Sequence, residues 1–302
     1  MATKKKKKTA PVHAPKVTWL AGARLRTLPL AIAPVAAGAG AAAAGKHFSL
    51  LLTLLCLAVA VFLQVGVNFA NDYSDGIRGT DAFRVGPGRL TGSGSKKPST
   101  VRNVSFAFFG LAALAGLAVT VISAQWWFLA VGALAIVAAW FYTGGKKPYG
   151  YAGLGELFVF VFFGLVATIG TTFVQTQGWS TRAAMASVGV GLLACAVLMI
   201  NNIRDIETDV KAGKNTLAVR IGKRAAIIAF CSMISIPMGV AGVLGYFFHG
   251  VLYAQFTWLA ILPAGLIAVM AKTPAEYITV LKITSFATMV YGILVGIGFA
   301  LS

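Results

Sequence analysis

The most constraining feature of this sequence is a series of long apolar runs separated by short polar segments. Runs of about 17 to 23 residues, long enough to cross a bilayer as a helix, lie near residues 28–45, 49–70, 104–122, 126–143, 153–173, 183–202, 225–247, 256–271 and 280–301. Backbone amides inside a bilayer have no water to bind, so such runs must form helices. We therefore expect an all-α integral membrane protein with nine transmembrane helices in a single bundle.

Composition favours a membrane protein over a soluble one. Of the 302 residues, 58% are hydrophobic and only 11% are charged, whereas soluble domains carry about twice that share of charge. The formal net charge is +18, but the basic residues lie between apolar runs and not on a separate basic domain. The expected partners are therefore anionic membrane lipid and phosphorylated substrates, and not nucleic acid.

The distribution of basic residues predicts the orientation of the bundle. If the N-terminus is cytoplasmic, every lysine and arginine except Lys46 and Arg182 falls in the N-terminal segment or after the second, fourth, sixth or eighth run. The positive-inside rule then predicts a multi-pass plasma-membrane protein with a cytoplasmic N-terminus and an external C-terminus. This topology needs the first apolar run, so we interpret it as a retained span and not as a cleaved signal peptide.

The N-terminus differs in composition from the rest of the chain. Residues 1–16 contain five consecutive lysines and two prolines, and we expect them to form a disordered basic arm. Residues 17–302 form the membrane domain. The three cysteines lie inside apolar runs without metal-binding spacing, which indicates core packing.

Acidic residues are concentrated at the ends of two apolar runs. Of the eight acidic residues in the chain, six lie in two short segments, and these six are Asp72, Asp75, Asp81, Asp205, Glu207 and Asp209. At about 100° per residue on a helix, Asn68, Asp72 and Asp75 share one face, which Gln64 extends one turn deeper. Asn201, Asp205 and Asp209 share a face in the same way, with Asn202 beside them.

Two such clusters are typical of a site for a metal-bound diphosphate. Crowded carboxylates repel one another unless a cation shares the site, and Mg²⁺ takes one or two carboxylates together with substrate phosphate oxygens. Both clusters end at the predicted cytoplasmic face, four runs apart and in the same direction. This pattern favours a duplicated four-helix unit with a ninth helix added. The alternative is that these carboxylates only solvate the helix ends.

Two loops and one tyrosine-rich segment lie on the same predicted side. The glycine-rich loop after the second run carries Arg84 and Arg89, and the loop after the sixth carries Lys214. Such side chains bind phosphate oxygens. The segment YTGGKKPYGYAGLGE, from Tyr142 to Glu156, supplies aromatic rings that can stabilise a carbocation or simply form an interfacial belt.

Three segments, NDYSDGIRGTDAFRVGPGRL, YTGGKKPYGYAGLGE and NNIRDIETDVKAGKNTLAVRIG, occur in this order. They resemble the motifs of the UbiA superfamily of intramembrane aromatic prenyltransferases, and most closely those of its naphthoate branch. The first segment matches NDxxDxxxD except that Gly79 stands at the last aspartate position and Asp81 follows two residues later. The family's DxxxD motif matches Asp205 and Asp209, and its YxxxK motif matches Tyr142 and Lys146.

The resemblance implies a fold and an activity for residues 17–302. It implies a UbiA-type transmembrane prenyltransferase domain with a cavity open to the cytoplasmic leaflet. The implied reaction is Mg²⁺-dependent transfer of a polyprenyl group from polyprenyl diphosphate to 1,4-dihydroxy-2-naphthoate, with loss of CO₂, giving demethylmenaquinone. The gly-rich loop is the expected lid that keeps water from the reactive cation.

The resemblance also implies roles for individual residues. The expected ligands of two Mg²⁺ ions bridging the diphosphate, and hence catalytic residues, are Asp72, Asp75, Asp205 and Asp209. The expected diphosphate-binding residues are Asn68, Asn71, Arg84, Arg89, Lys146, Asn201, Asn202 and Lys214. The residues expected to line the acceptor and the cation are Arg26, Tyr73, Tyr142 and Tyr149. Lys146 and Glu156 complete the expected catalytic set.

Two other functions remain open at this stage. The first is prenyl transfer to another aromatic acceptor, such as 4-hydroxybenzoate. The second is transport of a cation or of phosphate, with the acids as ligands. Transporters bind their substrates near the bilayer midplane, whereas the six clustered acids here lie near one predicted face, which favours the enzyme.

The predicted topology can be tested by cysteine labelling in intact cells. We expect cysteines placed in the segments after the second, fourth, sixth and eighth runs to be protected from a membrane-impermeant reagent, because these segments hold the basic residues. A cysteine at Lys46, on the other side, is the control and should react. Labelling of the loop around Arg84 from outside the cell contradicts the topology.

Overall fold

The computed structural model describes residues 17–83 and 86–302, and these residues are helical, with turns and loops but no strand. The all-α prediction is confirmed for this part of the chain. The predicted arm at residues 1–16 and Arg84 lie outside the described residues. Seven helices are long and apolar enough to cross a membrane, or eight if one bent pair counts as a span.

The helices follow the predicted apolar runs closely. The long ones are α3 (Leu50–Arg78), α4 (Pro98–Ser123), α8 (Thr181–Lys211), α9 (Leu217–Phe247) and α11 (Pro274–Ala300). The shorter ones are α1 (Trp19–Ala23), α2 (Pro29–Ala44), α5 (Phe128–Phe141), α6 (Gly155–Val159), α7 (Ala167–Thr176) and α10 (Trp258–Met270). Because α5 has only 14 residues, the count of nine spans and the duplicated unit stay predictions.

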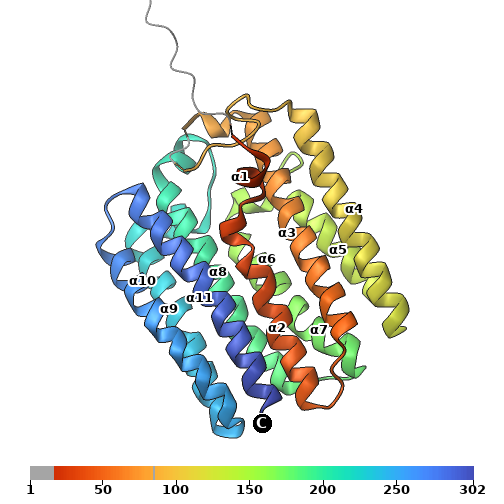
Figure 1. Cartoon of the computed structure of the whole chain (residues 1–302). Helices are drawn as coiled ribbons and strands as arrows, with labels where there is room; N and C mark the ends of the chain where they lie inside the picture. Colours follow the sequence, from red (N-terminus) through yellow and green to blue (C-terminus); the bar gives the residue numbers. More distant parts are fainter. Residues whose placement is uncertain (1–16, 84–85) are drawn as a thin grey trace, which may run out of the picture.

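The bundle is organised around α2, α8 and α11. The main pairings are α3 with α4, α8 with α9, and α11 with α2 (Figure 1). In its most apolar 18-residue window, α8 is 72% buried, whereas α3 is 22% buried. The apolar face of α3 is therefore left for other contacts, among them a cavity, while α8 lies in the core.

Close backbone approach defines the contact between α2 and α11. A Cβ atom on Gly40 would lie 2.1 Å from the carbonyl oxygen of Gly296, and one on Gly292 would lie 2.4 Å from that of Ala33. Small residues at helix contacts allow this approach, and van der Waals packing drives helix association in a bilayer. The central helices therefore pack through their glycines and alanines.

The first span is broken near its N-terminal end. Residues Trp19–Thr27 and α2 meet at 45°, and inside the first of these segments Arg24, which follows α1, is in the left-handed conformation with φ 55°. Pro29 begins α2, where its missing N–H is not needed. The Asn68 side chain on α3 donates a hydrogen bond of 2.9 Å to the carbonyl of Ala23, so the bent segment lies against the acidic end of α3.

A second irregularity lies between α6 and α7. Residues Phe160–Val166 form a π-helix, a rare geometry that often marks functional sites. Three of its residues line the main cavity, namely Phe162, Phe163 and Val166. The opposite face packs on α8, where Gly164 lies close to Gly191.

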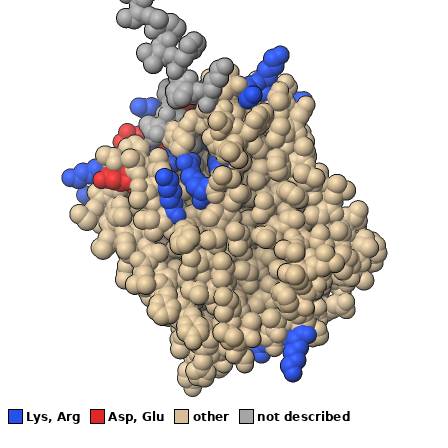
Figure 2. Space-filling model, viewed as in Figure 1, with Lys and Arg blue, Asp and Glu red and all other residues tan. Residues whose placement is uncertain are grey.

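Charged side chains are arranged at the ends of the bundle. Figure 2 shows lysine and arginine gathered mainly at the end near α1, above a broad surface without charge. Lys46, after α2, and Arg182, at the start of α8, belong to the opposite end. This arrangement is that of a multi-pass membrane protein; which end faces the cytoplasm stays a prediction.

We expect Gly40→Ala to lower the melting temperature of the detergent-solubilised protein. The new methyl group would overlap the Gly296 backbone, and the overpacking should cost about 1–3 kcal/mol. The matched control is Gly110→Ala on α4, where a Cβ meets nothing within 4 Å and where alanine improves helix propensity by about 1 kcal/mol. Equal melting temperatures for the two variants would contradict the proposed packing role of Gly40.

Candidate active site

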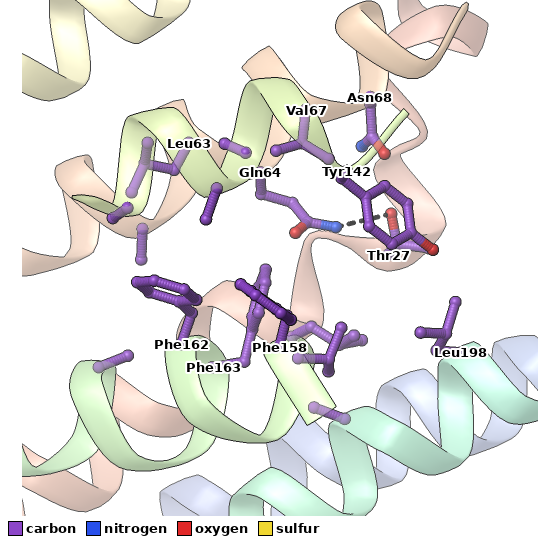
Figure 3. A pocket seen from close by; sticks show the side chains of 18 of the residues that line it. Thr27, Leu63, Gln64, Val67, Asn68, Tyr142, Phe158, Phe162, Phe163 and Leu198 are labelled. Atoms are coloured by element: carbon purple, nitrogen blue, oxygen red, sulfur yellow. Dashed lines mark hydrogen bonds between the residues drawn. The ribbon is translucent and has the colours of Figure 1, made fainter. Parts of the chain in front are cut away.

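A cavity of about 350 Å³ lies among α2, α3, α5, the α6–α7 segment and α8. At one end it is polar, and the charged residues lining that end are Arg24, Asp75, Arg89, Asp205, Asp209 and Lys214. The remaining wall is largely apolar. Figure 3 shows Leu63 and Val67 of α3 on one side of this space and Phe158, Phe162 and Phe163 on the other.

One face of α3 follows the cavity over most of the helix. The residues of α3 that line it are Cys56, Val59, Ala60, Leu63, Gln64, Val67, Asn68, Asn71 and Asp75. Their spacing of three or four residues is the helical period. From Cys56 to Asp75 the helix rises about 28 Å at 1.5 Å per residue, so the cavity extends through most of a membrane span.

Asp75 is the centre of the polar end. Its buried carboxylate lies 3.0 Å from the guanidinium of Arg89 and 3.0 Å from the ammonium of Lys214, and it accepts a short hydrogen bond from the hydroxyl of Tyr151. The Lys214 ammonium also lies over the Tyr151 ring, 4.7 Å from its centre. One carboxylate thus connects three different loops.

The α8 cluster has its own cation. Arg204 donates from Nε to Asp205 at 2.8 Å and from Nη2 to the side-chain oxygen of Asn201 at 3.0 Å. Its Nη1 is buried and has no hydrogen-bond partner among the described residues. Asp209, one turn further along, is buried and also lines the cavity.

Asp72 has a different environment from its neighbours on α3. Its two carboxylate oxygens accept hydrogen bonds of 2.8 Å from the backbone N–H groups of Leu90 and Thr91. It is not among the residues that line the main cavity. On α3 the cavity face consequently contains Asn68, Asn71 and Asp75, whereas Asp72 holds the glycine-rich loop.

Arg89 is carried by that loop into the acidic end of the cavity. Burial opposes its charge, but Asp75, Asp81, Asp72 and Asp205 outweigh burial and raise the pKa of the guanidinium. Its Nη1 is buried without a hydrogen-bond partner among the described residues. Arg89 therefore stays charged, and its Nη1 is directed at no acceptor among the described residues.

Aromatic residues cover the cavity beside the charged groups. Tyr142 and Tyr149 make an edge contact with ring centres 5.5 Å apart, and Tyr149 stacks on Phe158 at 4.0 Å. Burial raises the pKa of the Tyr149 phenol, so it is neutral at physiological pH. The Tyr149 hydroxyl donates to the carbonyl of Ala138, which fixes the ring.

The structure brings together most of the residues predicted for this site. Those that line the cavity are Asn68, Asn71, Asp75, Arg89, Tyr142, Tyr149, Asn201, Asn202, Asp205, Asp209 and Lys214. Lys146 does not join them, because it is exposed in the turn that follows α5. Tyr73 stacks on Trp140 instead, and Arg26 lines a small neighbouring pocket with Asp72 and Arg89.

Glu156 lies behind the cavity wall. Its Oε1 accepts a hydrogen bond of 2.9 Å from Asn202, a residue that lines the cavity. Its Oε2 is buried and has no hydrogen-bond partner within the described residues. Glu156 is therefore connected to the cavity through Asn202.

Several site residues were not predicted. Thr143 donates a hydrogen bond of 2.7 Å to the side-chain oxygen of Asn71, and Tyr151 binds Asp75. Both belong to the tyrosine-rich segment, so their position in a predicted site segment was the available signal. Arg204 directly precedes Asp205, but the sequence gives no sign that its side chain turns back onto that neighbour. Arg24 becomes a lining residue only through the bend in the first span.

The oxygen donors at the polar end fit a hard cation that also binds a ligand. In the described part of the chain, no group of three His, Cys, Asp or Glu side chains is close enough to hold a metal ion unaided. Asp75, Asp205 and Asp209 nonetheless line one cavity with asparagine amides. Mg²⁺ prefers such oxygen ligands and completes its octahedral shell with water and substrate phosphate.

Sequence comparisons identify the proteins that this chain resembles. The model of the UbiA prenyltransferase family matches residues 31–300. The chain is 47% identical to a 1,4-dihydroxy-2-naphthoate octaprenyltransferase of Mycobacterium tuberculosis, over 92% of this chain and 94% of that protein. It is 36% identical to the Escherichia coli protein of the same name, over 84% and 83% of the two chains.

Solved structures share the fold. A UbiA homolog from Archaeoglobus fulgidus, solved with DMAPP and Mg²⁺ bound, superposes with a TM-score of 0.64 at 16% identity, over 92% of this chain and 99% of that one. A UbiA homolog from Aeropyrum pernix in its apo form gives 0.63 at 18% identity, over 94% and 98%.

We expect Asp72→Ala to loosen the glycine-rich loop. The variant leaves the N–H groups of Leu90 and Thr91 without their acceptor, so trypsin should cleave after the exposed Lys96 about ten times faster. The control is Glu207→Ala, which removes an exposed acid on α8 and should leave the rate unchanged. Equal cleavage of Asp72→Ala and wild type would show that the loop is held in another way.

Proposed function

This chain belongs to the UbiA prenyltransferase family, and we propose that it transfers a polyprenyl group from polyprenyl diphosphate to 1,4-dihydroxy-2-naphthoate. The acceptor is proposed from the names of the relatives that match most of the chain and from the three sequence segments quoted above. The product expected after loss of CO₂ belongs to menaquinone biosynthesis. The site is proposed to open to the cytoplasm at the plasma membrane.

The division of the cavity into a charged end and a long apolar remainder supports this proposal best. Carboxylates and cations at one end suit a metal diphosphate, while the apolar wall along α3 suits a polyprenyl chain. A transporter binds a small hydrated ion through polar groups, so a long apolar wall favours a substrate with a hydrocarbon chain over such an ion.

The proposed Mg²⁺ ligands are Asp75, Asp205 and Asp209, helped by asparagine oxygens, with one ion at each acidic cluster. When bound with the diphosphate, Mg²⁺ neutralises its charge and stabilises it as a leaving group. We assign Asp72 to anchoring the loop that carries Arg89, because both of its oxygens are occupied by backbone N–H groups.

Arg89 and Lys214 are placed to bind the diphosphate directly. Both point into the polar end of the cavity, and both exchange Asp75 for phosphate oxygens without leaving their positions. Their positive charge stabilises the negative charge that grows on the leaving diphosphate as the carbon–oxygen bond breaks. The surrounding tyrosines and phenylalanines exclude water and face the allylic cation with their ring electrons.

Transfer then needs one new carbon–carbon bond. The ring carbon that carries the carboxylate attacks the allylic carbon, and diphosphate departs with the electron pair of the broken bond. Loss of the carboxylate as CO₂ returns an electron pair to the ring, so no oxidant is required. The direct product is demethylmenaquinol, the reduced form of demethylmenaquinone. Arg26 stays the partner of the acceptor carboxylate that the sequence resemblance implies, although it lines the small neighbouring pocket with Asp72 and Arg89 and not the main cavity.

The deciding experiment is an assay of the purified protein with 1,4-dihydroxy-2-naphthoate, a polyprenyl diphosphate and Mg²⁺, with mass spectrometry of the lipid product. Prenylated product that has lost CO₂ supports the proposal, and chelation of Mg²⁺ should stop its formation reversibly. Parallel reactions with 4-hydroxybenzoate test the other acceptor. Transfer to 4-hydroxybenzoate alone would overturn the assignment.

We expect Asp75→Ala, Asp205→Ala and Asp209→Ala each to lower kcat by about a hundredfold or more, because each loses a proposed metal ligand. Asp81→Ala should have a milder effect, since Asp81 does not line the main cavity but pairs with Arg89, which does. Glu207→Ala is the control and should behave as wild type. Near-normal turnover in all three aspartate variants at saturating Mg²⁺ would show the metal assignment to be wrong.

Glu156 is expected to act on the acceptor and not on the donor. Glu156→Gln should slow transfer about tenfold or raise the KM for naphthoate, while the KM for prenyl diphosphate stays unchanged. If the carboxylate only interacts with the helix dipole at the start of α6, the variant should lose a little thermal stability and keep both constants. Steady-state kinetics with each substrate varied in turn distinguish these results.

A further inference from the structure

Gln64 is a polar residue in the apolar part of the cavity wall. On the cavity face of α3 it is flanked by Leu63 and Val67, one turn below Asn68. At 1.5 Å per residue, Gln64 lies about 6 Å from Asn68 and about 10 Å from Asn71 along the helix axis, on the side away from the charged end. Gln64 therefore lies between the charged end and the apolar remainder of the cavity.

The orientation of the Gln64 amide follows from the residue it contacts. The Thr27 hydroxyl donates its proton to the carbonyl of Arg24 at 3.0 Å. It can therefore only accept from Gln64, and Gln64 Nε2 lies 3.3 Å from it. The amide nitrogen must face Thr27, so the amide oxygen faces away. Figure 3 shows this oxygen turned toward the side of the cavity that holds Phe158 and Phe162.

The Gln64 oxygen is an acceptor without a donor among the described residues, and it is open to the cavity. Gln64 is 7% exposed, and its only hydrogen bond within the described residues is the one to Thr27. A ligand with an O–H group would give this oxygen the hydrogen bond that no described residue supplies. Neither the polyprenyl chain nor a diphosphate bound to Mg²⁺ offers such a group.

We propose that Gln64 Oε1 accepts a hydrogen bond from a ring hydroxyl of the aromatic acceptor and so positions the ring below the diphosphate. The proposal rests on the function proposed above. Thr27 acts through Gln64, because it holds the amide in this orientation. The acceptor ring then lies between Gln64 and the phenylalanines, with its reacting carbon toward the charged end of the cavity.

A second buried glutamine shows what a purely structural amide looks like in this protein. Gln175 accepts from the backbone N–H of Ser49 at 2.7 Å and donates to the carbonyl of Thr171 at 2.9 Å. Both ends of its amide are paired within the protein, and it does not line the cavity. Gln175→Leu is therefore a matched control for Gln64→Leu.

The test is a thermodynamic cycle in which the Gln64 amide and a ring hydroxyl of the acceptor are removed separately and together. We expect Gln64→Leu to raise the KM for 1,4-dihydroxy-2-naphthoate about tenfold, with the KM for prenyl diphosphate unchanged. The analogues 1-hydroxy-2-naphthoate and 4-hydroxy-2-naphthoate each lack one of the two ring hydroxyls and are tested as inhibitors of the wild-type enzyme. The analogue that lacks the hydroxyl bound by Gln64 should bind about tenfold more weakly than the other analogue. In Gln64→Leu that analogue should lose no further affinity.

Two further variants sharpen the result. Thr27→Val should raise the KM for naphthoate in the same direction but less, because the amide keeps its oxygen and loses only its orientation. Gln175→Leu should lower the melting temperature and leave both KM values unchanged. If Gln64→Leu does not fold, the same cycle is run with Thr27→Val.

Additive losses in the cycle would overturn the proposal, because they mean that Gln64 and the ring hydroxyls act independently or that the amide oxygen only holds water. An equal rise in both KM values would also overturn it. Failure of the proposed function looks different, because wild type would then form no product from 1,4-dihydroxy-2-naphthoate. The two ideas can therefore fail separately.

Discussion

The contact of Asp75 with Arg89, Lys214 and Tyr151 is the interaction on which the rest of the site depends. It joins the end of α3 to the glycine-rich loop, to the loop between α8 and α9 and to the segment after α5. A buried carboxylate without these partners would be strongly unfavourable. The three loops are therefore ordered together, and the polar end of the cavity exists only when all of them are in place.

The same contact explains how the site exists without its substrate. Acids and cations pair across the polar end, so Asp75 and Asp205 do not stand as bare charges in a low-dielectric bundle. Under the proposed function, a metal diphosphate brings both signs of charge at once. Asp75, Asp205 and Asp209 would then hold the metal and Arg89 and Lys214 would bind the phosphate oxygens, so these charged side chains would keep opposite charges beside them. Binding then replaces one set of ion pairs by another.

The sequence predicts the helices well because the bilayer demands long apolar helices and little else. It also places both acidic clusters at one end of the bundle. It does not predict the rotation of individual residues at helix ends, where Asn71 turns into the cavity and Asp72 turns to the loop. Lys146 and Lys214 show the same limit, since both are basic loop residues and only the tertiary contact with Asp75 distinguishes them. The left-handed conformation of Arg24 and the π-helix at Phe160–Val166 are likewise not predicted by the apolar periodicity of the sequence.

The shortness of α5 has a consequence for the surrounding lipid. Its 14 residues span about 21 Å, whereas the hydrocarbon core of a bilayer is about 30 Å thick. Such hydrophobic mismatch is relieved when the bilayer thins locally around the short helix. If α5 is the span that the sequence predicts, lipid thinned around it would lie beside the cavity wall, because α5 lines the cavity through Val131 and Ala135. Headgroups and hydrophobic tails would then come closest to the space in which a lipid-like donor and a water-soluble acceptor must meet.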